Sequence, residues 1–118
     1  MDYDKLKYKT IKEISDFVEK GDLCPEDITH FYLEKISNDL EAKHVFTQVL
    51  VKTSLSSAKE SKQRAKAGLR KSILDGIPLS VKDLANIKGK HTGGGSLMTD
   101  ESKAEENALF INDLQDHG

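Results

Sequence analysis

The sequence of 118 residues predicts an α/β fold made of a helical hairpin, two strands and two further helices. Apolar residues recur at helical spacing after helix-start signals at Thr10 and Pro25, which predicts the hairpin. β-Branched and apolar residues cluster in residues 45–51 and 77–83, which predicts the strands. With 36% hydrophobic and 32% charged residues, the chain is polar for its size, and we expect a single domain over residues 1–118.

The first helix is predicted to begin after Thr10. Thr10 and Glu13 form a capping box, in which the hydroxyl and the carboxylate each accept a hydrogen bond from an unpaired backbone N–H group. Gly21 stands where a left-handed residue usually ends a helix. The apolar face between these two signals consists of Ile11, Ile14, Phe17 and Val18.

The second helix is predicted to run from Pro25 to Asn38, because proline suits the first helical position and Glu26 and Asp27 follow it at the positive end of the helix dipole. Its buried face is expected to contain Ile28, Phe31 or Tyr32, and Ile36. Cys24 precedes the proline and has two interpretations. It is either a reactive thiol at a helix N-terminus or, as we favour, a structural replacement for a capping serine.

The remaining elements alternate between strand and helix. Residues 45–51 predict a strand, and residues 54–70 predict a helix with a narrow apolar seam. A second strand is expected from Gly76 to Asp83, followed by a glycine-rich loop and a last helix over residues 105–117, with Gly118 as its cap. Because two strands alone make a poor sheet, we expect this chain to be part of a larger fold.

Charge and composition exclude several classes of protein. Residues 52–71 contain seven basic side chains and one acidic side chain, and this basic segment faces either RNA or solvent; with no interleaved aromatic residue, we favour solvent. One cysteine cannot form an internal disulfide, and no Cys/His spacing indicates zinc. No segment is typical of a signal peptide or a membrane span. We therefore expect a cytoplasmic protein without a zinc site and without a membrane or nucleic-acid partner.

Lys82 is the candidate for chemistry, because it ends the second predicted strand. Removal of an ammonium group from water favours the neutral amine, which can act as a general base for a serine nucleophile. The alternative is structural: Lys82 extends its ammonium group to solvent or pairs with Asp83 or Asp75. The glycine loop at residues 92–96 also has two interpretations, a phosphate cradle or backbone that takes positive φ or passes close to neighbouring chain, and the absence of a P-loop motif favours the second.

Residues 76–83, Gly-Ile-Pro-Leu-Ser-Val-Lys-Asp, followed by Lys88-Gly89, Thr92 and Gly95-Ser96, resemble the signature of the amidase signature family. The flanks are similar too, so that the resemblance extends over nearly the whole chain. It implies the N-terminal part of an amidase-signature domain, which cleaves carboxamide bonds with a Ser–cis-Ser–Lys triad and no cofactor. Lys82 matches the catalytic lysine of that triad.

The resemblance also implies what these 118 residues lack. Both triad serines belong to a later segment of the family pattern, and Ser80, Ser96 and Ser102 match neither of them. We therefore expect the isolated chain to be inactive, with a small-molecule amide as the substrate of the complete enzyme and the remainder of the domain as its partner. Two alternatives are a fragment similar to the A subunit of a tRNA-dependent amidotransferase, the one case in which we expect a nucleic-acid partner, and a non-catalytic module that binds a partner through an exposed strand edge.

Overall fold

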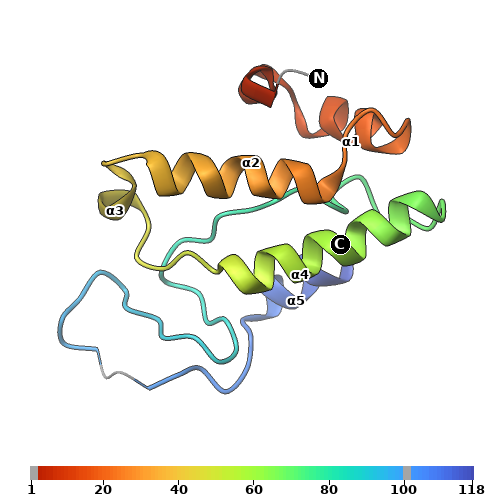
Figure 1. Ribbon diagram of the computed structural model, residues 1–118. Helices are drawn as coiled ribbons and strands as arrows, with labels where there is room; N and C mark the ends of the chain where they lie inside the picture. Colours follow the sequence, from red (N-terminus) through yellow and green to blue (C-terminus); the bar gives the residue numbers. More distant parts are fainter. Residues whose placement is uncertain (1–2, 100–101) are drawn as a thin grey trace. The chain divides into compact units, whose positions relative to one another are not determined.

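The computed structural model describes residues 3–99 and 102–118, which form two compact units. The first unit extends to Pro78 and includes His117 and Gly118, and the second unit is Leu79–Asp116. The first unit contains a 3-10 helix, η1 (Tyr3–Tyr8), followed by α1 (Ile11–Glu19), α2 (Pro25–Asn38), α3 (Ala42–Val45) and α4 (Val51–Lys66); the second contains α5 (Leu109–Asp116) (Figure 1).

Both ends of α1 form as predicted. The Thr10 hydroxyl accepts a hydrogen bond from the Glu13 N–H at 3.2 Å, and the Glu13 carboxylate accepts one from the Thr10 N–H at 2.8 Å. At the other end Gly21 has a φ of 78°, and the N–H groups of Gly21 and Asp22 donate to carbonyls of the last turn. This is a Schellman motif, which satisfies carbonyl groups that the helix leaves unpaired.

The helix α2 has its predicted bounds and packs along α4 (Figure 1). The core of the first unit is a cluster of five buried side chains: Leu6, Ile14, Val18, Leu23 and Ile28. The predicted apolar face of α1 is correct for Ile14 and Val18. It is wrong for Ile11, which is 44% exposed on the first turn.

The helix α4 begins three residues before the predicted start and ends four residues before the predicted end. Its C-terminus is set by Gly68, which has a φ of 67° and whose N–H donates to the Ala65 carbonyl at 3.2 Å. The next N–H, that of Leu69, donates to the Arg64 carbonyl at 2.9 Å. A left-handed residue in a second Schellman motif stops the helix here, so that the prediction of helix up to Arg70 was wrong.

The prediction of an α/β fold is wrong for the described residues, which contain helices and irregular segments but no strand or sheet. In residues 45–51, Val45 ends α3 and Val51 begins α4. Residues 77–82 run irregularly without a ladder partner. β-Propensity largely reflects packing against neighbouring strands, and these two runs have no such neighbours in the described chain. The isolated bridge between His91 and Lys103 does not extend into a ladder.

The last helix is shorter than the predicted 105–117, because the residues before α5 pair with an earlier segment of the second unit. The Gly89 N–H donates to the Ala104 carbonyl at 2.8 Å, and the Ala108 N–H donates to the Asn86 carbonyl at 2.9 Å. Backbone groups used in this way are not available for a helix, and α5 begins at Leu109.

The buried carboxylate of Asp75 joins α4 to the residues that follow this helix in the first unit. Its oxygens accept hydrogen bonds from the Arg64 guanidinium at 2.8 Å and from the Lys71 N–H at 2.9 Å, while Arg70 donates to its backbone carbonyl at 3.0 Å. Burial raises the pKa of Asp75, but the hydrogen bonds from Arg64, Lys71 and Ser61 outweigh it and lower the pKa to about 2. The ionised form of Asp75 is therefore part of the fold.

Candidate functional site

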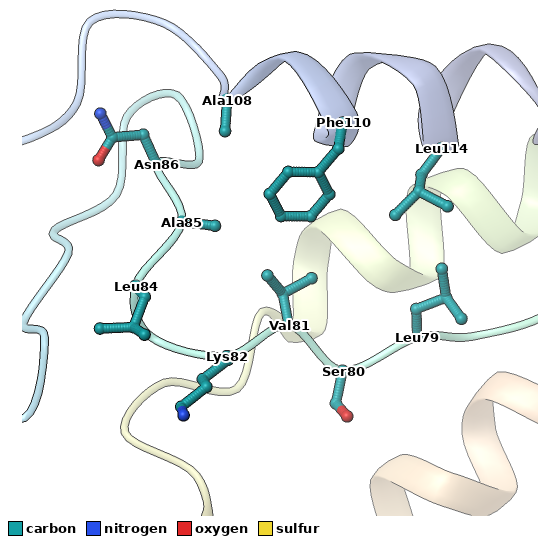
Figure 2. Close-up of a pocket in the computed structure, with 10 residues that line it drawn as sticks. All are labelled: Leu79, Ser80, Val81, Lys82, Leu84, Ala85, Asn86, Ala108, Phe110 and Leu114. Atoms are coloured by element: carbon teal, nitrogen blue, oxygen red, sulfur yellow. The ribbon is translucent and has the colours of Figure 1, made fainter.

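The predicted site lies on the segment that opens the second unit. From Leu79 to Lys82 the side chains alternate, with Leu79 and Val81 pointing toward α5 and Ser80 and Lys82 pointing the opposite way (Figure 2). This alternation is what an extended backbone imposes. A turn follows, in which the Leu84 N–H donates to the Lys82 carbonyl at 2.7 Å. The segment therefore separates an apolar side from a polar side.

The apolar side lines a pocket of about 700 Å³ within the second unit. Phe110 and Leu114 of α5 approach it from one side, and Leu79 and Val81 from the other (Figure 2). Much of this apolar surface is uncovered, since Phe110 is 49% exposed and Leu84 is 64% exposed. The arrangement can accommodate an apolar group, with Lys82 and Ser80 among the few polar residues of the lining.

Lys82 is exposed, so the expectation of a lysine at the end of a buried strand is not met. Within the described residues of the second unit, its ammonium group has no hydrogen-bond or ion-pair partner. The Asp83 carboxylate accepts from the Gly93 N–H and not from Lys82, and the Asp75 carboxylate is bound to Arg64 within the first unit. The exposure of Lys82 matches the other structural alternative, an ammonium group that extends to solvent. The amine is thus available to a group that approaches from solvent.

The glycine loop is held against the turn that follows Lys82. The Gly93 N–H donates to Asp83 Oδ1 at 2.9 Å, and the Gly94 N–H donates to the Asp83 carbonyl at 2.9 Å. Gly94 and Gly95 have φ values of 60° and 71°, which confirms the interpretation of these glycines as positions of positive φ. The Gly93 N–H, which a phosphate cradle would need, is already bound to a carboxylate of the same unit.

Three of the seven basic side chains in residues 52–71 form ion pairs within the first unit. Lys62 lies 2.6 Å from Glu26, and the Arg64 and Arg70 side chains form ion pairs with Asp75 and Glu19 at 2.8 and 3.1 Å. The hydrogen bond from Lys62 lowers the pKa of Glu26. The Lys62 contact joins α4 to α2, and the Arg70 contact joins the segment after α4 to α1, which supports a structural role for this part of the charge.

Two smaller predictions concern Cys24 and metal sites. Cys24 occupies the N-cap position of α2, as expected, but its side chain makes no capping hydrogen bond. Among residues 3–99 and 102–118, no cluster of three or more His, Cys, Asp or Glu side chains could hold a metal ion. No helix in that part of the chain is long and apolar enough to cross a membrane.

Sequence reasoning missed the two carboxylates that organise the structure, Asp75 and Asp83. Asp75 binds Arg64, eleven residues earlier, and Asp83 binds Gly93, ten residues later. Neither separation along the sequence is typical of a helix or a hairpin, so the periodicity of the sequence does not indicate these two contacts. The useful signal is predicted burial, because the residues next to Gly76 and Lys82 are expected to lie at the ends of a buried strand. A carboxylate in such a place needs several hydrogen-bond donors.

Comparison with known proteins places the chain among amidase-related sequences. It is 29% identical over 113 residues to the A subunit of glutamyl-tRNA(Gln) amidotransferase from Nitrosococcus oceani, covering 96% of this chain and 23% of that protein. It is 30% identical over 109 residues to the corresponding mitochondrial protein of Ornithorhynchus anatinus, covering 92% and 21%. For the mitochondrial protein of Anopheles gambiae the identity is 40% over 78 residues, covering 64% and 16%.

The chain thus spans less than a quarter of the length of each of these relatives. No significant match was found among solved structures. A sequence model of the amidase family matches residues 27–118, which include most of α2 and all of α4, the Lys82 segment and the glycine loop. Because this match extends over most of the chain, the chain belongs to the amidase family.

Proposed function

We propose that this chain is the part of an amidase-type enzyme that supplies the basic lysine of a Ser–cis-Ser–Lys triad, and that Lys82 is this lysine. The observation that carries the proposal is the family match over residues 27–118, which contains the Gly-Ile-Pro-Leu-Ser-Val-Lys-Asp segment. The exposure of Lys82 and its lack of a partner in the described residues of the second unit are consistent with an amine that meets a serine hydroxyl from another segment.

In the proposed reaction the neutral Lys82 amine accepts, through a bridging serine, the proton of a nucleophilic serine. That serine attacks the carboxamide carbon, an acyl-enzyme forms with loss of ammonia or an amine, and water or ammonia then resolves it. The triad also needs two serines, and Ser80, Ser96 and Ser102 match neither of them. We therefore expect no amide hydrolysis by the 118-residue chain alone.

A second candidate is amide transfer of the kind named for the relatives, which are glutamyl-tRNA(Gln) amidotransferase subunits. Both candidate reactions form the same acyl-enzyme. They differ in the molecule that accepts the acyl group or the ammonia. Saturable binding of the chain to the purified partner subunits of the Nitrosococcus oceani enzyme would support the transfer candidate. Absence of binding would favour a free-standing hydrolase.

The Lys82 assignment is tested by a graft, in which residues 27–118 replace the matching segment of the Nitrosococcus oceani amidotransferase protein. Ammonia release is measured from a panel of primary carboxamides that includes glutamine. Lys82→Ala should lower the rate by about 100-fold or more, the scale of a lost general base. Lys82→Arg should not restore it, because a guanidinium group stays protonated.

Lys88→Ala is the matched control, since Lys88 is also an exposed lysine of the second unit. It should leave the rate of the graft unchanged, and the isolated 118-residue chain should release no ammonia. Full activity of the Lys82→Ala graft would contradict the proposal. The graft with Lys82 unchanged is the reference protein. If it is folded, as judged by circular dichroism, but releases no ammonia, this result would contradict the proposal as well.

A further inference from the structure

The contacts of Asp83 form a clamp between two segments of the second unit. One segment is the turn that begins at Lys82, whose carbonyl accepts from the Leu84 N–H at 2.7 Å. The other is the glycine loop, residues 92–96, which donates two successive N–H groups to Asp83. The Gly93 N–H binds the carboxylate at 2.9 Å, and the Gly94 N–H binds the backbone carbonyl at 2.9 Å.

Gly93 fits this clamp because it has no side chain. Unlike Gly94 and Gly95, it does not have a positive φ, so its backbone conformation alone would accept alanine. A Cβ atom at Gly93 would nevertheless lie 2.8 Å from Asp83 Oδ2, closer than real Cβ contacts. The carboxylate and the bare glycine are therefore matched in shape as well as by a hydrogen bond.

We propose that Asp83 is a positioning residue for the Lys82 site, which fixes the turn after Lys82 by holding it to the glycine loop. In the described part of the second unit no side-chain contact holds the Lys82 ammonium, so the placement of the amine depends on the backbone from which it projects. Asp83 is the next residue in that backbone. The catalytic part of this inference rests on the proposed function of Lys82, whereas the clamp itself does not.

The clamp predicts different roles for the two amides of the loop. Removal of the Asp83 carboxylate takes the acceptor from the partly buried Gly93 N–H, which then lacks a partner. The Gly94 N–H keeps its acceptor, because the Asp83 carbonyl belongs to the backbone. Asparagine at position 83 retains an oxygen of the same reach, so it should preserve much of the contact.

Hydrogen exchange followed by NMR on the 118-residue chain tests the clamp without any need for activity. In Asp83→Ala the exchange rate of the Gly93 amide should rise by about tenfold, with a smaller rise at Gly94, and Asp83→Asn should lie close to the natural chain. Asp116→Ala removes an exposed carboxylate of α5 and should change neither amide. Unchanged exchange at Gly93, or an equal rise throughout the second unit, would overturn the clamp.

A double-mutant cycle tests the steric part. Gly93→Ala should raise exchange in residues 92–96 by about tenfold in the natural chain, but by much less in the Asp83→Ala background, where no carboxylate opposes the new methyl group. An equal effect in both backgrounds would overturn the claim that the carboxylate is what excludes a side chain at Gly93.

The catalytic role is tested in the graft described above. Asp83→Ala should lower kcat by about tenfold or more with a smaller change in KM, and Asp83→Asn should recover most of the loss. If Asp83→Ala loosens Gly93 but leaves kcat unchanged while Lys82→Ala abolishes activity, the positioning role is refuted and the function of Lys82 stands. If Lys82→Ala retains activity, the proposed function fails, and the exchange experiment still decides the clamp.

Discussion

At the scale of single residues, Asp75 shows how a fully buried carboxylate is accommodated in a small unit with a modest core. Its side chain has no exposed surface, and Arg64 reaches it with two parallel hydrogen bonds. Bidentate pairing of this kind compensates much of the free energy of desolvation, because both carboxylate oxygens find donors. Removal of Arg64 would leave the Asp75 charge buried without its ionic partner.

The acid dependence of stability should depend on Asp75. Its folded-state pKa of about 2 lies below the usual 3.8, so the ionised group stabilises the fold above about pH 4, and this contribution is lost as the pH falls toward about 2. We expect the urea midpoint of the natural chain to fall over this interval. Asp75→Asn should have a lower midpoint at about pH 6 and a smaller further decrease toward acid.

Glu13→Gln provides the matched control for this measurement. Hydrogen bonds from the Thr10 N–H, the Lys9 ammonium and the Thr10 hydroxyl lower the pKa of Glu13 to about 2 as well, but this side chain is exposed. The control removes the share of the acid dependence that belongs to the capping box of α1. An acid slope in Asp75→Asn as steep as that of the natural chain would refute the assignment to Asp75.

At the scale of the elements, two glycines with positive φ differ in what surrounds them. Gly68 ends α4 with open space around it, whereas a Cβ atom at Gly76 would lie 2.7 Å from Cγ of Pro25, in the first turn of α2. Alanine at Gly68 should therefore cost only the conformational free energy of a left-handed residue, about 1 kcal/mol. Alanine at Gly76 adds a clash with a rigid ring and should cost about 1–3 kcal/mol more.

Urea denaturation of Gly68→Ala and Gly76→Ala compares these two costs directly, with each variant serving as the control for the other. Gly76→Ala should also weaken the contact between α2 and the segment after Asp75, which the Pro25→Ala variant can test by relieving the clash. Equal destabilisation by the two alanine substitutions would show that the Pro25 contact is not a constraint on Gly76.

The helix ends were predictable where the signal is local. The capping box at Thr10, Gly21 after α1 and Pro25 at the start of α2 each act within one turn of chain, and all three form as predicted. The strands predicted at residues 45–51 and 76–83 do not form in the described chain, because a strand needs a partner strand that local sequence does not reveal. The glycine loop was predicted from the sequence, but its hydrogen bond to Asp83 was not. This bond joins residues ten apart, and no sequence periodicity indicates it.

At the scale of the whole molecule, the two units differ in how much apolar surface they bury. The buried cluster of the first unit contains five side chains, whereas Ile111 is the one fully buried apolar side chain among the described residues of the second unit. Leu79, Val81, Leu84 and Phe110 of the second unit are all exposed. Apolar burial is the main favourable contribution to folding, so the second unit should be the less stable of the two.

Limited proteolysis should therefore cut the second unit first. With a protease of broad specificity at low concentration, early cleavage is expected within residues 79–116 and late cleavage in α2 and α4, as located by mass spectrometry of the fragments. Phe110→Ser, which removes an exposed apolar side chain of the pocket, should leave the order unchanged. Initial cleavage inside α2 or α4 would contradict the expected ranking of stability.

The alternation of side chains from Leu79 to Lys82 constrains how this segment can change in length. Leu79 and Val81 point toward α5, and Ser80 and Lys82 point away from it (Figure 2). Loss or gain of a single residue between Leu79 and Lys82 would exchange the two sets, bringing the lysine toward α5 and an apolar side chain to the polar side. Amino-acid replacements of similar polarity preserve the arrangement, whereas insertions and deletions of one residue in this stretch do not. We therefore expect related sequences to differ here by substitution and not by a change in length.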